Sequence, residues 1–339
     1  PLVYVNQVGA NTDVIFDGAS KVVSSSGEVV LQMKRFEEDF QVVSLGKVDK
    51  MQGLRFADEA NRIENIHDAL ILGVRDYFAK SGFSRALLGL SGGIDSALVA
   101  ALACQALGSK NVHGLLMPSE FSSQHSVDDA VALAENLGMT YDIVPIKAIY
   151  NSANEALVPM FSGRGFDVTE ENLQARIRGL LLMAYSNKFG NMLLNTSNKS
   201  EAAVGYSTLY GDSNGGLSVI GDVYKTDVYG LSRFINRNGE VIPENTITKA
   251  PSAELRPNQQ DSDSLPAYDV LDRLLFEFIE RKQSANDLIQ MGFIEADVHK
   301  VVRLVNNSEY KRFQFPPILR VSSKAFGQGR RFPIVAKYL

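Results

Sequence analysis

The stretch LGLSGGIDS, residues 88–96, decides the fold class of this chain. It overlaps an apolar run at 86–90 that has the length of a buried strand, and it leads into residues 96–107, which have the composition of a buried helix. Two consecutive glycines let the backbone turn sharply and approach a ligand, and free N–H groups at the start of a helix favour an anion. The stretch therefore predicts a strand, a phosphate-binding turn and a helix in succession.

The alternation of strand and helix continues downstream. Apolar runs at 112–117, 140–146 and 192–196 are separated by helical segments at 124–137, 147–160 and 169–188. Strands spaced by helices of this length form right-handed crossovers and a parallel sheet. We expect an α/β fold, a doubly wound parallel sheet with helices on both faces, whose ligands bind at the carboxyl ends of the strands.

The flanking regions differ in character. Residues 1–45 contain short strand-like runs with no obvious core of their own, and 46–56 are expected to be a linker. Helices are expected at 57–80 and 222–236, and segments 267–283, 284–291 and 294–306 predict a C-terminal helical subdomain. Segments 210–218 and 255–264 are rich in Gly, Ser, Asn and Asp, and are either plain surface loops or lids over a site.

Composition excludes several classes of protein. With 45% apolar and 22% charged residues the chain is globular, and no apolar run is long enough to span a bilayer. The first residues lack the pattern of a secretory signal, and a formal charge of −5 argues against a dedicated nucleic-acid binder. The single cysteine, Cys104, fits a reducing cytoplasm and lies in an apolar helix, where an unreactive thiol is expected. Basic side chains without acidic ones follow residue 311, either as a solvated tail or as a patch facing a polyanionic small molecule.

Asp95 is the unusual residue of the glycine-rich turn, because a carboxylate by itself repels phosphate. The presence of this carboxylate is explained if Mg²⁺ lies between Asp95 and the phosphates of the ligand. The turn lacks the lysine of a Walker A loop and the spacing of dinucleotide-binding folds. The alternative is a structural turn whose aspartate caps the helix.

The turn resembles the pyrophosphate-binding loop of the ATP pyrophosphatases, which split ATP between its α and β phosphates to adenylate a substrate. This resemblance also implies their adenine nucleotide α-hydrolase-like fold. Three further stretches narrow it: 169–178, in which Asn172 and Arg176 share a helix face, 194–201 after the last strand, and 251–255. Together they resemble the NAD synthetase family, and within it the synthetase portion of the glutamine-dependent enzymes, from about residue 57 to the end.

This resemblance implies a set of site residues. ATP is expected at Gly89, Leu90, Ser91, Gly92, Gly93, Ile94, Asp95, Ser96, Thr196, Lys225 and Ser252. Deamido-NAD is expected at Asn172, Arg176, Glu201, Tyr206, Ser207, Thr208, Leu209 and Lys311. Asp95 and Glu201 would hold Mg²⁺, and with Lys225 they would be the catalytic residues. Leu209 departs from the ammonia-only bacterial enzymes, which have a lysine there, and agrees with the glutamine-dependent members.

The resemblance also implies a reaction and partners. The carboxylate of deamido-NAD would be adenylated by ATP and then amidated to NAD, with release of AMP and pyrophosphate. Residues 1–45 resemble the last strands of a nitrilase-type amidase (glutaminase) domain, so we expect a fragment that uses ammonia where the full-length enzyme uses glutamine. A homo-oligomer is expected. The remaining alternatives are another adenylating amidotransferase, a tRNA-modifying enzyme of the same group, and a nucleotide-sensing module. The net negative charge of the chain argues against a tRNA-modifying enzyme. The two carboxylates Asp95 and Glu201, which a sensor would not need for a metal, argue against a nucleotide-sensing module.

Overall fold

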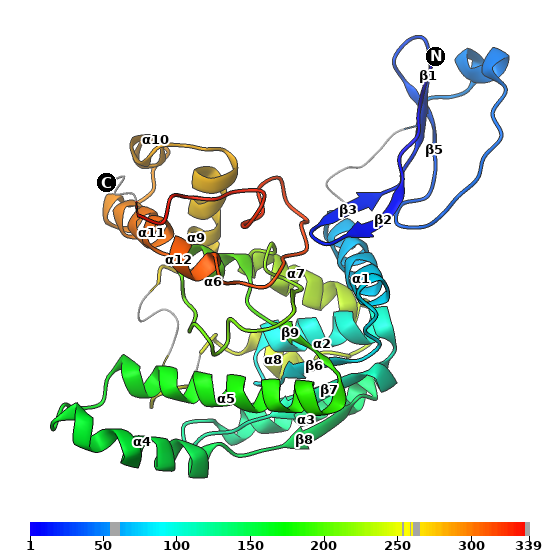
Figure 1. Ribbon diagram of the computed structural model, residues 1–339. Coiled ribbons are helices and arrows are strands. Elements are labelled where there is room, and N and C mark those ends of the chain that lie inside the picture. Colours follow the sequence, from blue (N-terminus) through cyan, green and yellow to red (C-terminus); the bar gives the residue numbers. More distant parts are fainter. Residues whose placement is uncertain (55–61, 253, 258, 260–264, 336–339) are drawn as a thin grey trace.

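A five-stranded parallel sheet lies at the centre of the computed structural model, which describes residues 1–54, 62–252, 254–257, 259 and 265–335 (Figure 1). The strands, in spatial order, are β10 (Leu217–Ser218), β9 (Met192–Asn195), β6 (Ala86–Gly89), β7 (Val112–Leu116) and β8 (Thr140–Ile143). The chain runs outward from β6 to β8 and then returns to β9 on the other side of β6. The strand order therefore reverses between β6 and β9, and open parallel sheets bind ligands at such a switch point.

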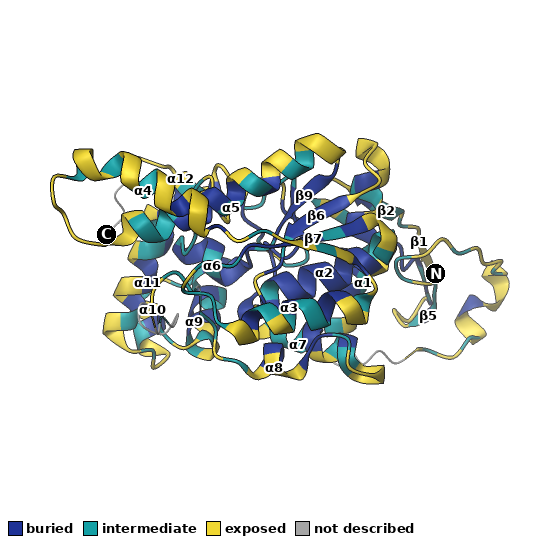
Figure 2. Cartoon of the chain, turned by 90° about the horizontal axis from the view of Figure 1, so that it is seen from below, coloured by how far each residue is buried: buried dark blue, intermediate teal, exposed yellow. Residues whose placement is uncertain are grey.

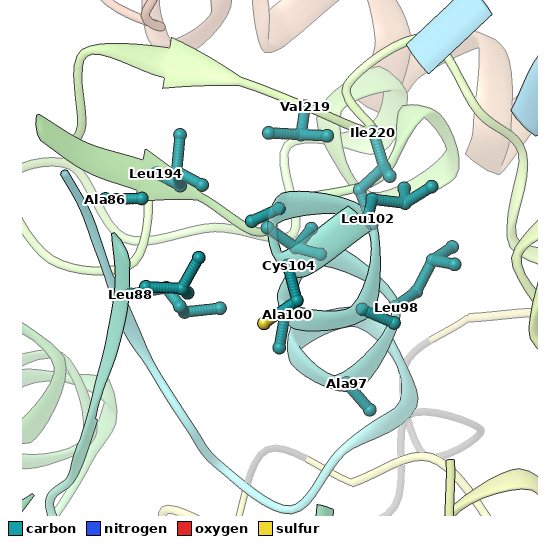
Figure 3. Packing of buried hydrophobic residues seen from close by; sticks show 14 of the residues in the cluster. Ala86, Leu88, Ala97, Leu98, Ala100, Leu102, Cys104, Leu194, Val219 and Ile220 are labelled. Atoms are coloured by element: carbon teal, nitrogen blue, oxygen red, sulfur yellow. The ribbon is translucent and has the colours of Figure 1, made fainter. Parts of the chain in front are cut away.

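Helices cover both faces of the sheet. One face carries α1 (Arg62–Ser81), α2 (Ile94–Leu107), α3 (Gln124–Leu137) and α7 (Lys225–Ile235), and the other carries α4 (Lys147–Phe161) and α5 (Val168–Phe189). Successive strand residues alternate between the two cores. Leu88 and Leu194 pack toward α2 (Figure 3), whereas Leu87 packs with the residues of α5. Because both faces are covered, the central strands β6 and β9 are buried and largely apolar, whereas the edge strand β8 is more exposed and carries polar residues. The expected doubly wound α/β sheet is confirmed.

Several element boundaries differ from those expected. Helix α2 begins at Ile94 and not at residue 96, because Gly93 adopts an extended conformation and is its N-cap. Helix α7 begins at Lys225 and not at 222, and the expected helix 267–283 is α9 (Tyr268–Leu275) followed by the π-helical turn η5 (Phe276–Glu280). The expected start of the first helix at residue 57 lies outside the described residues. Asp95 thus lies in the first turn of a helix and not in the loop before it.

The segment 210–218 packs against the body and is therefore not a plain surface loop, and its role as a lid stays a prediction. It ends in β10, where Leu217 pairs with Leu194 and is fully buried. Asn195 Nδ2 donates to the carbonyl oxygens of Asp212 and Asn214 at 2.8 and 3.1 Å, which ties the segment to β9. A two-residue strand has no periodicity, so the sequence pattern could not reveal it. In the other candidate lid, 255–264, residues 258 and 260–264 lie outside the described part of the chain.

The expected C-terminal helical subdomain is present. It contains α9, η5, α10 (Ala285–Gln290), α11 (Glu295–Asn307) and α12 (Glu309–Arg312), whose apolar side chains form a core of their own. Helix α6 (Lys199–Val204), which follows β9 directly, buries Ala202, Ala203 and Val204 in that core. Helix α6 therefore connects the sheet to the subdomain. The short helix α8 (Glu244–Thr248) lies against α3, and the 3₁₀ turns η2 (Ser109–Asn111) and η3 (Asn236–Asn238) follow α2 and α7.

The N-terminal residues form two small antiparallel sheets. Strands β1 (Leu2–Tyr4), β4 (Lys21–Val23) and β5 (Val29–Gln32) project away from the body, whereas the hairpin of β2 (Val8–Asn11) and β3 (Val14–Asp17) lies on α1 (Figure 1). The 3₁₀ helix η1 (Leu45–Lys50) packs Val48 against Val22 and Val30, so the beginning of the expected linker belongs with these strands. The division into 1–45, 46–56 and 57–339 stays a prediction.

Figure 2 shows the buried residues gathered in the sheet and α2, and exposed residues along α4. Among the described residues, no helix combines the length and the apolar composition that crossing a membrane requires.

Candidate functional site

A cavity of about 310 Å³ opens at the carboxyl ends of β6 and β9, where the strand order reverses. It is lined by the turn after β6, by Thr196 and Glu201 after β9, and by Lys225 at the start of α7. The segment after α8 contributes Ser252 from the opposite side. All residues that the sequence associates with ATP, from Gly89 to Ser96 together with Thr196, Lys225 and Ser252, line this one cavity.

The turn from Ser91 to Ser96 is built so closely that it needs glycine. Gly92 has φ +77°, and a Cβ placed on it would lie 2.1 Å from the backbone oxygen of Ser126. The Ser91 hydroxyl accepts from the Gly93 N–H at 3.2 Å and lies 3.1 Å from the Ser96 hydroxyl, which itself donates to the Gly93 carbonyl. The turn is therefore held by its own side chains at the N-terminus of α2, where the helix dipole favours an anion.

A lysine and two carboxylates meet at the edge of this turn. The Lys225 ammonium, almost completely buried, donates in a short contact to Asp95 Oδ2 and at 3.3 Å to Glu201 Oε1. Asn198 orients the Asp95 carboxylate, because its Nδ2 donates to Asp95 Oδ1 at 2.9 Å, and it caps the helix that carries Glu201, because its Oδ1 accepts from the Glu201 backbone N–H at 3.0 Å. Lys225 is 130 positions from Asp95 and 24 from Glu201 in the chain, so it is the fold that brings the two carboxylates to one cation.

The donor set of this group fits Mg²⁺ shared with a phosphate. Asp95 and Glu201 both line the cavity and both contact one ammonium nitrogen, so their oxygens lie within a few ångströms of a common point. Within the described ranges there is no group of three or more His, Cys, Asp or Glu side chains placed to hold a metal. In a site of this kind the protein usually supplies one or two carboxylate ligands to Mg²⁺, and phosphate oxygens and water molecules supply the other ligands.

The residues expected to meet the dinucleotide lie together beside the cavity. Thr208 Oγ1 donates to Asn172 Oδ1 at 2.7 Å, and Arg176 Nε donates to the Leu209 carbonyl at 3.2 Å. Lys311 Nζ donates to the carbonyl oxygens of Gly205 and Ser207, each at 2.7 Å. Only Glu201 and Tyr206 of this set line the cavity itself. The structure therefore brings the set together, with most of it next to the cavity, and leaves its ligand a prediction.

Four charged residues that line the cavity, Arg178, Asp212, Lys249 and Glu254, were missed as site residues by the sequence analysis. Arg178 lines it, and its Nε donates to the Met117 carbonyl at 3.0 Å; burial lowers the pKa of this guanidinium to about 10, so it stays charged at neutral pH. Asp212 also lines the cavity and accepts the Thr208 N–H at 2.7 Å. Arg178 lies two residues beyond Arg176, within a stretch already singled out, and that proximity was its only signal. Asp212 had none, because the composition of its segment predicts a loop.

A polar cluster closes one side of the cavity. Glu254 Oε1 accepts from the hydroxyls of Ser126 and Ser123 at 2.7 and 3.0 Å, and from Lys249 Nζ at 2.8 Å. Burial acts to raise the pKa of Glu254, but the hydrogen bonds from Lys249 and Ser126 outweigh it and leave the pKa below its ordinary value. The segment that carries Ser252 is thereby attached to the N-terminus of α3.

The basic C-terminal region is neither a solvated tail nor wholly a patch for an anion. The Arg312 side chain is buried, paired with Glu309 at 2.8 Å, and donates to the Ala203 carbonyl at 2.6 Å. Arg330 donates to the Ile279 carbonyl at 2.6 Å and lies over the Phe332 ring. These arginines stabilise the helical subdomain, which the charge count alone could not show.

Comparison with known proteins shows to which family the chain belongs. The NAD synthase family model matches residues 66–315. A glutamine-dependent NAD(+) synthetase of Synechocystis is 52% identical over 100% of this chain, and one of Acinetobacter baylyi is 49% identical over 98% of it. The structure of a glutamine-dependent NAD+ synthetase from Acinetobacter baumannii with adenosine diphosphate superposes with a TM-score of 0.66 at 44% identity, covering 98% of this chain and 61% of that one.

The chain covers 61% and 62% of the length of those two curated relatives. The match to the family model nevertheless extends over most of the chain and includes the cavity and the residues that line it. The chain belongs to the NAD synthase family.

Proposed function

We propose that this chain converts deamido-NAD to NAD, using ATP to activate the nicotinate carboxylate and ammonia as the nitrogen donor. The observation that carries the proposal is the Lys225 ammonium held between Asp95 and Glu201, at the edge of a glycine turn that opens α2. Such an arrangement suits a triphosphate that is split between its α and β phosphates.

In the first step a carboxylate oxygen of deamido-NAD attacks the α-phosphorus of ATP. The bond from the α-phosphorus to the β-phosphate oxygen breaks, pyrophosphate leaves with the electron pair, and an acyl adenylate forms. The backbone N–H groups in the first turn of α2 hold the leaving pyrophosphate, and the Lys225 cation offsets its charge. Phosphoryl transfer of this kind depends on positioning and on charge stabilisation more than on covalent help. Mg²⁺ held by Asp95 and Glu201 would supply further charge neutralisation.

In the second step the nitrogen of ammonia attacks the activated carbonyl carbon. AMP leaves with the electrons of the C–O bond, and the nitrogen, which arrives with three hydrogens and keeps two, loses one proton to solvent. Water must be kept out, because it would hydrolyse the adenylate. The packed segment 210–218 on one side and the cluster of Glu254, Lys249 and Ser126 on the other enclose the cavity for this purpose.

We also propose that the group beside the cavity, built on Asn172, Arg176, Thr208 and Lys311, binds the dinucleotide. Its position next to Tyr206 and Glu201, which line the cavity, supports binding of the dinucleotide beside the nucleotide turn. The single buried thiol of Cys104 is in keeping with a reducing cytoplasm.

A homo-oligomer fits the exposed apolar side chains of α4 and α5. Val158, Met160, Val168 and Leu180 are each more than 60% exposed on these two helices, which is unusual for an isolated chain. For the full-length, glutamine-dependent form we also propose a glutaminase domain as a partner of this chain, which would supply the ammonia. Sedimentation of this chain as a monomer at micromolar concentration would contradict the homo-oligomer.

The proposed activity is tested by pyrophosphate release from ATP with Mg²⁺ and ammonium, with and without deamido-NAD. Release should depend on the dinucleotide and should produce NAD. Lys225→Met should lower turnover at least about a hundredfold, the scale of losing one transition-state charge contact, whereas Lys188→Met, at an exposed lysine of α5, should not. Release that ignores the dinucleotide would refute the proposal and favour another adenylating enzyme.

A further inference from the structure

The N-terminus of α7, which carries Lys225, is capped by residues from other helices. Its own N-cap residue, Tyr224, makes no side-chain capping bond. The Lys225 N–H donates instead to Ser200 Oγ of α6 at 2.9 Å, and the Thr226 N–H donates to Asp272 Oδ2 of α9 at 2.8 Å. The first two backbone donors of this helix thus find acceptors on two separate elements.

Ser200 and Asp272 are joined to each other. The Ser200 hydroxyl donates to Asp272 Oδ1 at 2.5 Å while it accepts from Lys225. The two oxygens of Asp272 therefore hold the start of α7, one directly and one through Ser200. Ser200 is fully buried and Asp272 is 5% exposed, so water cannot replace either contact. Burial raises the pKa of Asp272, and the bonds from Ser200 and Thr226 oppose that rise.

Helix α9 also reaches the other end of the Lys225 side chain. The Lys225 ammonium lies 5.3 Å from the centre of the Tyr268 ring, within the range of a cation–π contact. Tyr268 and Asp272 are four residues apart and so share one face of α9. One face of this helix therefore contacts the Lys225 ammonium through Tyr268 and reaches the Lys225 backbone N–H through Ser200.

We infer that Asp272 is a positioning residue, which acts through Ser200 and the start of α7 to set where the Lys225 ammonium stands between Asp95 and Glu201. The inference rests on the proposed function, because the position of that ammonium matters to the splitting of ATP. It gives the C-terminal helical subdomain a part in the chemistry, although Asp272 lies outside the cavity.

The isosteric change Asp272→Asn probes this role. Asparagine has one carbonyl oxygen for two donors, so either the Ser200 hydroxyl or the Thr226 N–H loses its acceptor and meets an amide N–H instead. Ser200→Ala removes the link to Lys225 alone. In either variant the start of α7 shifts, and a shift of about 1 Å at a site of this kind lowers the rate by about a hundredfold.

The experiment is a double-mutant cycle on kcat/KM for ATP in dinucleotide-dependent pyrophosphate release. Asp272→Asn and Ser200→Ala should each lower kcat/KM at least about tenfold in the unmodified background, and less than about twofold when Lys225→Met is already present. Two variants are matched controls: Asp269→Asn, at an exposed carboxylate of the same helix, and Ser232→Ala, at a buried serine of α7 that bonds only to Val228 within its helix. Both should stay within about twofold of the unmodified chain.

The outcomes separate the inference from the proposed function. A loss of equal size in both backgrounds would show a general structural effect, and no loss would show no role; either result overturns the inference. If turnover with Lys225→Met is too slow to measure, the same cycle on the dissociation constant of ATP, measured by calorimetry, decides between these outcomes. If Asp272→Asn does not fold, Ser200→Ala decides by the same criteria. Failure of the unmodified chain to release pyrophosphate with deamido-NAD would refute the proposed function, and the cycle on ATP affinity would still decide the role of Asp272.

Discussion

Replacing Gly92 by alanine tests the close approach that shapes the nucleotide turn. Two penalties add in this variant. The first is the left-handed backbone at φ +77°, which disfavours a Cβ by about 1–2 kcal/mol. The second is the new methyl group, which would lie 2.1 Å from the Ser126 backbone oxygen, whereas ordinary contacts of a Cβ lie at 3.4–4 Å. The Ser126 backbone must then move by about 1 Å, and overpacking of this kind adds about 1–3 kcal/mol.

The control is Gly138→Ala, at the end of α3. Gly138 has φ +65°, and a Cβ there would meet nothing within 4 Å, so this variant reports the backbone penalty alone. In urea unfolding, Gly92→Ala should lose about 2–5 kcal/mol and Gly138→Ala about 1–2 kcal/mol. Gly92→Ala should also weaken ATP binding about a hundredfold, because the turn is displaced, whereas Gly138→Ala should not. Equal losses of stability in the two variants, with unchanged ATP affinity, would refute the reasoning.

Three further predictions concern buried charges and the thiol. Lys199→Met removes the buried cation that Glu280 and Asp222 share, at 2.8 and 2.9 Å, and should lower the free energy of unfolding by about 3–5 kcal/mol in urea at pH 7. Burial acts to raise the pKa of Glu280, but the charge of Lys199 outweighs it and leaves the pKa below 4.5. The ion pair therefore stabilises the fold above pH 4.5 and loses this effect as the pH falls, so the stability lost in Lys199→Met should be smaller at pH 4 than at pH 7. A loss of stability that does not change with pH would contradict this. Burial raises the pKa of Cys104 to about 11, so a disulfide reagent at pH 8 should label the thiol only after denaturation, and rapid labelling of the folded chain would show the burial to be wrong. Arg178→Met should weaken ATP binding about tenfold while Arg176→Met changes mainly the KM for deamido-NAD, and the reverse pattern in calorimetry and kinetics would exchange the two roles.

The parts that sequence predicts well are those whose information is local. The strand, turn and helix around Gly92 occupy one contiguous stretch, and the glycine positions follow directly from the backbone they must adopt. The repeating order of strands and helices is also local, so the parallel sheet, with ligands at the carboxyl ends of its strands, could be expected, whereas the strand order came from the structure. Asp95 and Glu201 were expected together because each follows a buried strand on the same edge of the sheet, and the structure brings both to Lys225.

The parts that could not be predicted depend on contacts between distant residues. Strand β10 has two residues and forms only because β9 is there to pair with it. Arg312 has the sequence context of a surface cation, but a carboxylate and several carbonyl oxygens compensate its burial. Asp272 gives no signal either, since its importance lies in a hydroxyl 72 positions earlier in the chain.

Helix α6 begins with four successive residues, Asn198 to Glu201, that each serve a different neighbour. Asn198 orients Asp95, Lys199 reaches Glu280, Ser200 meets Asp272, and Glu201 contacts the ammonium of Lys225. Consecutive side chains of a helix point about 100° apart around its axis. These four contacts therefore depend on the rotational position of each residue around the axis as much as on the residue type. Deleting or inserting one residue here would rotate every one of these side chains away from its neighbour, even with all four residue types retained. Homologous chains should therefore tolerate substitutions in this turn far more readily than any change in its length.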